Sequence, residues 1–254
     1  MRLVSYNILD GGEGRADPLA EVIEAQNPDV VALVEAVDLS VIERIANRLK
    51  FDYIEAPGVT QASAILSRST IRYTINHALV DRRFSKSLLE AAIVDPTGSE
   101  WSFGVVHLHA HAMESDEQIR EREVDALLDI FMSHRNANRS HILCGDFNSN
   151  SPIQQIDPEK CKPSTRKAWH ANGGLIPRRA IQKLLKNGYV DALHAVHPEQ
   201  AKTQGTFSTQ FPGQRVDYIF THSIARERIK QAKIEDDRLA KYASDHFPVI
   251  ADIT

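Results

Sequence analysis

Cysteine is scarce in this sequence, and signal-peptide and transmembrane patterns are lacking. These absences bear on where in the cell we expect the protein. The only two cysteines are Cys144 and Cys161, and Cys144 lies inside an apolar run typical of a buried strand. Two cysteines without a secretory context do not indicate a disulfide framework. We find no basic leader followed by an apolar signal core, and no apolar run long enough to cross a bilayer. We therefore expect a cytoplasmic protein without a transmembrane segment.

The sequence also lacks an excess of positive charge, internal repeats and low-complexity linkers. It has 30 lysines and arginines against 34 aspartates and glutamates, which gives a formal net charge of -4. This balance provides no global attraction to nucleic acid or an anionic membrane, although a local basic face is compatible with it. Because no change of composition divides the chain, we expect residues 1–254 to form one domain. No protein partner is evident from the sequence.

The stretch from His141 to Asn150 is the most informative part of the chain. It begins as a short apolar run that predicts a buried strand, and the run stops at Gly145. Asp146 and Asn148 follow two positions apart, and alternation along a strand would place them on the same side. A carboxylate there can bind a hard cation or take a proton from water. Alternatively, one of the two residues merely caps the next turn.

Several other strand-like segments end on, or adjoin, residues that can bind metal or move a proton, namely Asn7, Glu35, His107, Asp217, Asp245 and His246. Alone, Asn7 suits a turn, Glu35 a helix N-terminus and His107 a hydrogen-bonded core position. Asp217 lies within an apolar strand, where a carboxylate needs a partner. Together these residues suggest hydrolysis at phosphorus, because carboxylate and amide oxygens are hard ligands suited to Mg²⁺ or Mn²⁺.

Apolar patterns predict strands in both halves of the chain, with helices between them. The clearest helical patterns cover residues 38–49, 115–134 and 179–187, whereas residues 152–177 show no regular pattern. The strands fall into two groups with no linker separating them. We therefore expect an α/β fold with two sheets packed face to face and helices outside.

Seven short segments have the order found in one family of enzymes. They are Ser5-Tyr6-Asn7-Ile8, Val34-Glu35, Ala64-Ile65-Leu66-Ser67-Arg68, His107-Leu108-His109-Ala110-His111, Gly145-Asp146-Phe147-Asn148-Ser149, Arg215-Val216-Asp217-Tyr218-Ile219 and Ser244-Asp245-His246-Phe247-Pro248. In these segments the chain resembles the endonuclease/exonuclease/phosphatase superfamily of metal-dependent phosphoesterases. The resemblance spans residues 5–248, and its last three segments are the most specific. It implies a four-layer α/β sandwich of two packed, mostly antiparallel sheets flanked by helices.

The resemblance also implies a metal site and its cofactor. Glu35 would be the principal ligand of Mg²⁺ or Mn²⁺, with Asn7 and Asp245 nearby. The histidines at positions 107, 109 and 111 would share one face if the strand continued through them, which could also suggest zinc. No cysteine pair supplies further zinc ligands. Through the resemblance His111 is a secondary candidate, and only His107 is assigned to the site.

The catalytic roles implied by the resemblance fall on five residues. Asp146 would activate the attacking water, and Asn148 would orient the water or bind the phosphate. Asp217 would hold the imidazole of His246 against a phosphoryl oxygen. His107 would occupy the family's other histidine position and contact the phosphate.

We therefore expect a metal-dependent phosphodiester hydrolase of the nuclease type, with DNA or another nucleic acid as the first substrate candidate. The alternative is a phosphatase or phosphodiesterase acting on an inositol phosphate, a phospholipid headgroup or another small phosphoester. A non-catalytic binding module on the same fold is a further alternative. Eight basic residues with no acid among them lie between Lys160 and Lys186. They form either a face that attracts a polyanion or an ordinary solvated surface.

Overall fold

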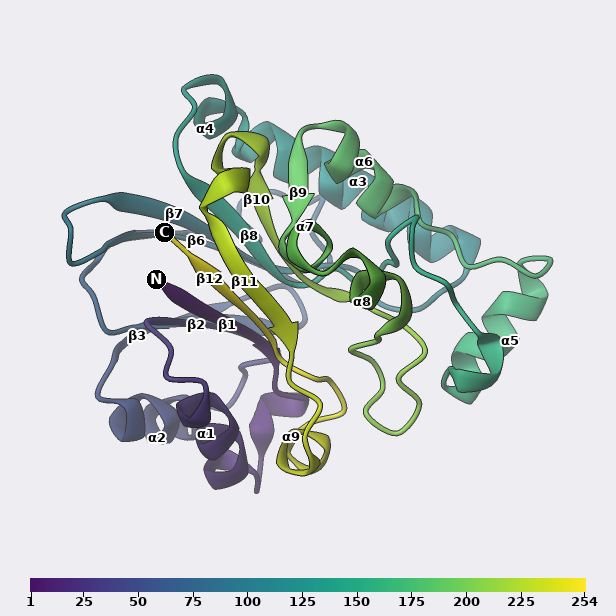
Figure 1. The fold of residues 1–254 in the computed structure, drawn as a ribbon, viewed down its shortest axis with the longest axis horizontal. Helices are drawn as coiled ribbons and strands as arrows, with labels where there is room; N and C mark the ends of the chain where they lie inside the picture. Colours follow the sequence, from purple (N-terminus) through teal and green to yellow (C-terminus); the bar gives the residue numbers. More distant parts are fainter.

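Two six-stranded sheets pack face to face in the computed structural model, which describes residues 1–254 apart from the side chains of residues 223 and 224 (Figure 1). The first sheet contains, in spatial order, β11 (Ile229–Ile234), β12 (Val249–Ile253), β1 (Arg2–Asn7), β2 (Val30–Val34), β4 (Ala62–Ser67) and β3 (Asp52–Pro57). The second contains β5 (Ile71–Asn76), β6 (Ser87–Val94), β7 (Glu100–His107), β8 (His141–Asp146), β10 (Asp217–His222) and β9 (Tyr189–Asp191). The β1–β2 and β7–β8 pairs are parallel, and the other neighbouring strands are antiparallel.

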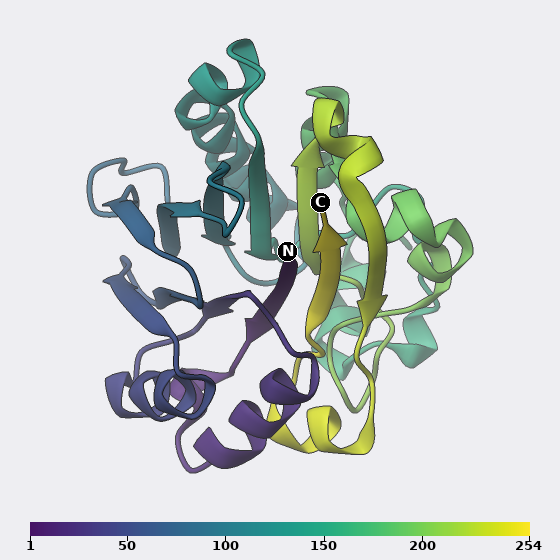
Figure 2. The ribbon, with the colours of Figure 1, turned by 60° about the vertical axis from the view of Figure 1, so that its left-hand side comes forward.

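Helices cover the outer faces of both sheets, as the two ribbon views show (Figures 1 and 2). Below the first sheet lie α1 (Ala16–Ala25), α2 (Leu39–Leu49) and α9 (Arg238–Ala243). Above the second lie α3 (Glu114–Ile130), α4 (Met132–Asn136) and α6 (Arg179–Lys186). The remaining helices are α5 (Pro163–Ala171), α7 (Ala192–Val196) and α8 (Pro198–Thr203). This arrangement confirms the predicted four-layer α/β sandwich. Within the described residues, no helix combines the length and apolar character needed to cross a membrane.

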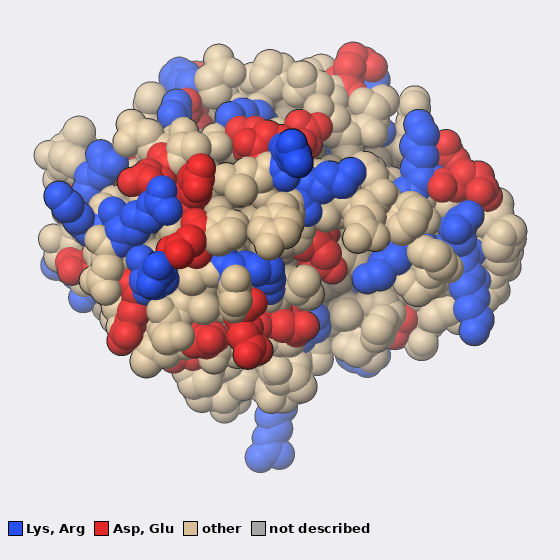
Figure 3. Space-filling view, turned by 90° about the horizontal axis from the view of Figure 1, so that it is seen from below, with Lys and Arg blue, Asp and Glu red and all other residues tan. Residues whose placement is uncertain are grey.

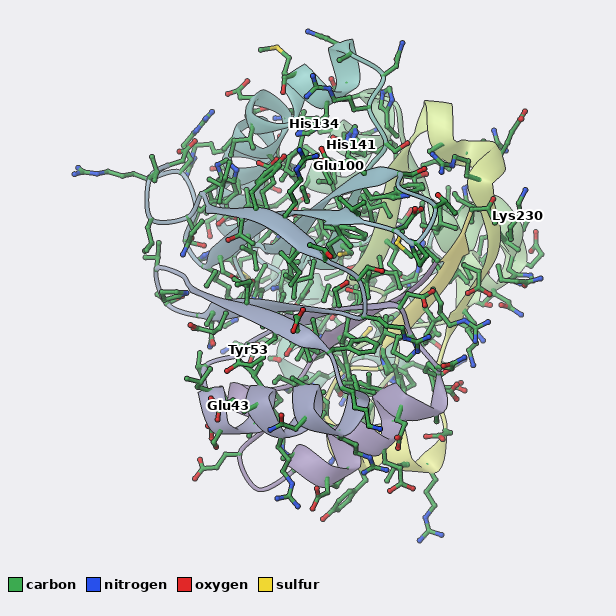
Figure 4. All side chains as sticks on the ribbon, turned by 90° about the vertical axis from the view of Figure 1, so that its left-hand side faces the viewer. Glu43, Tyr53, Glu100, His134, His141 and Lys230 are labelled. Atoms are coloured by element: carbon green, nitrogen blue, oxygen red, sulfur yellow. The ribbon has the colours of Figure 1, made fainter. Side chains whose placement is uncertain are left out.

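The central strands are apolar on both faces because each contacts the opposite sheet on one side and helices on the other. All five residues of β2 are buried, as are all six of β4 and of β8. The edge strand β3 instead alternates between exposed and more buried positions. Its Tyr53 hydroxyl donates to Glu43 of α2 at 3.0 Å, which ties the edge strand to a covering helix (Figure 4).

Two expectations about helices were wrong. The helix predicted over residues 115–134 is divided at Phe131 into α3 and α4. Residues 152–177, which lack a regular sequence pattern, contain α5. Only Thr165 and Ala168 of α5 are buried. Because both are small and one is polar, they leave no amphipathic stripe for a sequence pattern to reveal.

Candidate active site

A row of three side chains crosses one end of the second sheet. Strand register places His107 of β7 beside Asp146 of β8, and Asp217 of β10 on the other side of Asp146. Side chains at directly paired positions point to the same face of a sheet. All three residues are almost fully buried. The register therefore brings together one histidine and two carboxylates that are far apart in the sequence.

The adjoining end of the first sheet adds Asn7, Glu35 and His246. Asn7 is the last residue of β1, and Glu35 follows β2 directly. The Asn7 Nδ2 donates to Glu35 Oε1 at 3.1 Å and to Asp146 Oδ2 at 3.2 Å. His246 precedes β12, and its Nδ1 donates to Asp217 Oδ2 at 2.9 Å. The site therefore lies where the ends of the two sheets meet.

A glycine before Asp146 is required by the close approach of two strands. Gly145 has a φ of +131°, and a Cβ added there would lie 2.0 Å from the carbonyl oxygen of Val106. Any other residue would push β8 away from β7. That movement would disturb the register that places Asp146 beside His107.

Asn148 reaches Asp146 by a turn rather than by strand alternation. Strand β8 ends at Asp146, and Asn148 has a left-handed backbone with φ of 49°. Its backbone N–H donates to Asp146 Oδ1 at 2.8 Å, and its Nδ2 donates to Asp146 Oδ2 at 3.2 Å and to the Leu108 carbonyl at 3.0 Å. The expectation that strand alternation places the two side chains together was wrong, although they are adjacent. Asn148 connects the ends of β7 and β8.

The local charges shift two key pKa values in the same direction. Burial and the neighbouring Asp217 carboxylate raise the pKa of Asp146 to about 7. Burial lowers the pKa of His246, but the negative charges of Asp217, Asp146 and Asp245 outweigh it and raise that pKa to about 10. His246 is therefore a cationic hydrogen-bond donor at neutral pH, and Asp146 is an unusually basic carboxylate.

Lys86 is a site residue that the sequence patterns did not reveal. Its Nζ donates to His107 Nε2 at 2.7 Å, and it lines the same cavity as Glu35 and Asp146. Burial, the Lys86 ammonium and His246 hold the pKa of His107 well below its usual range. His107 is therefore a neutral imidazole. A single lysine just before a predicted strand carries no motif, so only the fold reveals this contact.

Three charged residues of α3 hold the loops around Lys86 and His107. The sequence patterns did not reveal these three residues either. Glu123 accepts hydrogen bonds from the backbone N–H groups of Ser85, at 2.9 Å, and His109, at 2.8 Å. Arg120 donates to the carbonyl groups of His109 and His111 at 2.8 and 2.7 Å, and to Glu117 at 2.8 Å. All three charged residues are almost completely buried. The sequence pattern of this helix predicts only its apolar residues as buried, so it gives no sign that these three charged residues are buried too.

The site's oxygen atoms fit a divalent cation. Glu35, Asp146 and Asp245 line one cavity of about 810 Å³, and one carboxylate oxygen each of Asp217 and Asp245 is buried without a hydrogen-bond partner. Carboxylate oxygens are the ligands that Mg²⁺ and Mn²⁺ prefer. Carboxylates that outnumber the neighbouring cations also need a positive charge. The prediction of a divalent metal is therefore supported at this general level.

Geometry distinguishes among the possible ligands. In the described part of the chain, one group of three has ligand atoms all within 4.8 Å of one another: Asp146, Asp217 and His246. Within this group, His246 and Asp217 are hydrogen-bonded to each other. Because a protonated imidazole has no free lone pair, His246 does not serve as a metal ligand in this state. Asn7 directs its amide NH₂ toward Glu35 and Asp146, while its Oδ1 accepts from the Leu9 N–H at 3.0 Å. In this arrangement the Asn7 amide nitrogen orients the Glu35 and Asp146 carboxylates.

His109 and His111 diverge from His107 because β7 ends at His107. His109 Nε2 contacts Asp116 Oδ1 at 3.2 Å, and its Nδ1 contacts Ser85. His111 has a φ of 72°, is exposed and lines the cavity. Among the described residues these three histidines form no joint metal-binding group.

Comparison with known proteins gives a family match and several similar folds. Residues 4–246 match the model of the Endonuclease/Exonuclease/phosphatase family. No protein with a curated description matches the chain. An AP endonuclease from Archaeoglobus fulgidus is similar in structure, with 19% sequence identity, a TM-score of 0.72, and coverage of 100% of this chain and 99% of that chain.

Two further solved structures have the same fold. A 3′ phosphatase, NExo, from Neisseria bound to a product DNA hairpin has 22% identity, a TM-score of 0.74, and coverage of 100% of this chain and 99% of that chain. The APE2 catalytic domain of Xenopus laevis has 17% identity, a TM-score of 0.70, and coverage of 100% of this chain and 91% of that chain.

Proposed function

Because this chain belongs to the endonuclease/exonuclease/phosphatase family of phosphoester hydrolases, we propose that it hydrolyses a phosphodiester with the help of Mg²⁺ or Mn²⁺. The observation that carries this proposal is the position of Asp146. It lies between His107 and the Asp217–His246 pair on neighbouring strands, and it faces the cavity that Glu35 also lines.

Asp146 is the residue best placed to orient and deprotonate the attacking water. Its pKa of about 7 makes it a stronger base than an exposed aspartate, and a catalytic base is most effective near the working pH. Asn7 and Asn148 donate to its carboxylate and so hold its orientation. The Asn148 amide is also close enough to the cavity to bind the water or the phosphate.

His246 and His107 approach the phosphoryl group with different protonation states. The Asp217 carboxylate accepts from His246 Nδ1 and favours the charged imidazolium, which leaves Nε2–H to donate to a phosphoryl oxygen. His107 is neutral, and its Nε2 accepts from Lys86. The Lys86 ammonium therefore supplies the positive charge on that side, and His107 holds it there.

Glu35 and Asp245 would hold the metal, with Asp146 beside them. The Glu35 carboxylate is oriented by Asn7 and by the Asp10 N–H, at 2.9 Å. The Asp245 carboxylate has a buried oxygen without a hydrogen-bond partner. A divalent cation would supply charge neutralisation at the non-bridging and leaving oxygens of the phosphate.

DNA or another nucleic acid is the first substrate candidate, and a small phosphoester such as an inositol phosphate or a lipid headgroup is the second. An AP endonuclease and a 3′ phosphatase bound to product DNA have similar structures, which supports the first. We also propose that residues 1–254 act as one domain, because strands of both sheets contribute to one apolar core.

A hydrolysis panel with EDTA, followed by Mg²⁺ or Mn²⁺, tests the proposed reaction. The substrates are bis-p-nitrophenyl phosphate, p-nitrophenyl phosphate, plasmid DNA, a duplex with an abasic site, and inositol phosphates. We expect EDTA to abolish cleavage of a diester and added metal to restore it. Asp146→Asn protein, purified in the same way, controls for contaminating nucleases. Metal binding without hydrolysis of any diester would instead support the binding-module alternative.

A further inference from the structure

The cavity beside the proposed catalytic residues has a second wall formed by α5 and its preceding residue. The lining includes the carboxylates and His246 of the proposed site, and also Lys162, Thr165, Lys167 and Ala168. A volume of about 810 Å³ is within the range of cavities that bind small organic molecules. It is larger than a single phosphate needs. The cavity therefore has room for the group to which the phosphate is attached.

Most basic residues between positions 160 and 186 are already engaged elsewhere. Ion pairs join Lys160 to Asp157, Arg166 to Glu159, Arg179 to Glu114 and Glu121, and Lys183 to Asp125. Arg178 donates to the carbonyl groups of Ser151, Pro152 and Gln154. Within the described contacts, Lys162, Lys167 and Lys186 have no acidic partner, and two of these three line the cavity. The basic segment is therefore not a uniform polyanion surface.

Lys162 is held close to the reacting centre by an aromatic ring. Its Nζ lies 4.9 Å from the centre of the Phe207 ring, and that ring lies 4.6 Å from the centre of the His246 ring. A cation over an aromatic face is attracted by the ring's electrons. One phenyl ring thus contacts both the ammonium of Lys162 and the imidazole of His246.

Hydrogen bonds anchor α5 to the body of the protein at two points. The buried Thr165 hydroxyl donates to Gln214 Oε1 at 2.7 Å, and Gln214 Nε2 donates to Asn150 Oδ1 at 2.9 Å. After the helix, Asn172 Nδ2 donates to the Ala112 carbonyl at 2.8 Å. These contacts fix α5 relative to the loop that follows Asp146. Seen from below, blue Lys and Arg side chains stand at the right of the surface with red Asp and Glu side chains among them (Figure 3).

The cavity therefore brings acidic and basic side chains together, since Glu35, Asp116, Asp146 and Asp245 line it along with Lys86, Lys162 and Lys167. Apolar side chains, including Met113, Ala168, Phe207 and Val216, also line it. We propose that Lys162 and Lys167 form a second anion-binding subsite, which binds a further phosphate on the organic group joined to the scissile phosphate. The substrate class is a phosphodiester with an additional phosphate, as at the end of an oligonucleotide. This inference rests on the proposed function, since it places the scissile phosphate at Asp146.

The test compares thymidylyl-thymidine with the same dinucleotide carrying a phosphate at its 5′ or its 3′ end. The measured quantity is the ratio of kcat/KM for each phosphorylated form to kcat/KM for the unphosphorylated form. We expect the wild-type protein to prefer one phosphorylated form. Lys162→Ala and Lys167→Ala should each reduce that ratio about tenfold, because each removes a charged contact to the added phosphate. Lys186→Ala is the matched control, since Lys186 is exposed and is not among the cavity-lining residues.

Two outcomes separate the failure of this inference from the failure of the proposed function. If bis-p-nitrophenyl phosphate is cleaved but the ratio is the same in the wild-type protein and the Lys162→Ala/Lys167→Ala double variant, the second subsite is wrong. If no diester is cleaved, the proposed hydrolysis is wrong, and calorimetric titration in Mg²⁺ with the same dinucleotides still tests the subsite. Equal affinity for phosphorylated and unphosphorylated forms would then refute it.

Discussion

The two ends of strand β8 carry buried polar clusters of opposite character. At its final residue, Asp146 joins Glu35, Asp217 and Asp245 around the proposed active site, and these carboxylates outnumber the nearby cationic groups. At its first residue, His141 lies among aromatic and imidazole rings. Six residues of one strand therefore connect two different electrostatic environments.

The histidine end is balanced by its own hydrogen bonds. His141 Nδ1 donates to the Arg139 carbonyl and its Nε2 accepts from the Tyr189 hydroxyl, both at 2.9 Å. Nearby, Glu90 lies between His134, at 3.2 Å, and His77, at 2.7 Å. His134 and His141 lie close together near the top of the side view (Figure 4).

The two clusters differ in how the negative charge of a buried carboxylate is compensated. Burial opposes ionisation of Glu90, but hydrogen bonds from His134 and His77 lower its pKa to about 2. Asp146 has a pKa raised to about 7 because burial and another carboxylate dominate its surroundings. The Glu90 carboxylate is therefore balanced by its histidine partners. The carboxylates around Asp146 instead require a bound cation or a proton. Perturbed carboxylates in a cavity are typical of functional sites.

The largest expected effect is a loss of kcat in variants of the proposed active site, compared with a variant of the histidine cluster near His141. Asp146→Asn and His246→Gln should each lower kcat by about 10²- to 10⁴-fold, because each removes a proton-transfer or charged donor group. His134→Gln, also next to a carboxylate, should leave kcat within a few-fold of the wild-type value. Circular dichroism checks that all three variants fold. Comparable losses for His134→Gln and His246→Gln would remove the distinction between the two ends.

The histidine end should make the stability of the protein depend on pH. Burial lowers the pKa of His141 from 6.5 to about 4, with further lowering by His134, His222 and Arg135. The unfolded chain therefore binds a proton below pH 6.5 that the folded protein does not, so stability falls as the pH decreases. This residue should account for a loss of up to about 3 kcal/mol between pH 6.5 and pH 4.

Denaturant unfolding at several pH values measures that loss. His141→Gln should make the free energy of unfolding less dependent on pH over this range, even if the variant is less stable overall. A variant with the same pH slope as the wild-type protein would contradict the assignment to His141.

A smaller effect is expected from the metal site. Glu35→Gln should raise the Mg²⁺ concentration that gives the half-maximal rate by about tenfold or more, because an anionic ligand becomes neutral. Glu90→Gln changes a buried carboxylate of β6 that contacts His134 and His77. It is the control and should leave the metal titration unchanged. A normal titration in Glu35→Gln would exclude Glu35 as a ligand.

The smallest effect concerns Lys86, which approaches His107 from the loop before β6. Lys86→Met should lower kcat/KM several-fold, because it removes a positive charge facing the cavity. Arg82→Met changes an exposed basic residue four positions earlier and serves as the control. If both variants behave alike, the Lys86 contact has no part in the reaction.

Strand positions and the residues that end them could be predicted from the sequence. The apolar run before Asp146 and the run before Glu35 are local signals, since a strand buried on both faces must be apolar throughout. The motifs around Asp146, Asp217 and His246 also predicted the family, which the family match confirms. The catalytic and metal-binding roles remain predictions.

The partners of those residues depended on tertiary structure. Lys86 contacts His107 across 21 positions, and Glu123 binds the Ser85 N–H across 38 positions. The basic segment could not be interpreted from its own residues either, because its partners include Glu114, Glu121 and Asp125 of α3. Local sequence determined which strands form and which polar residues lie at their ends. Sheet register and helix packing decided which charges meet, because hydrogen bonds and ion pairs depend on distance in space.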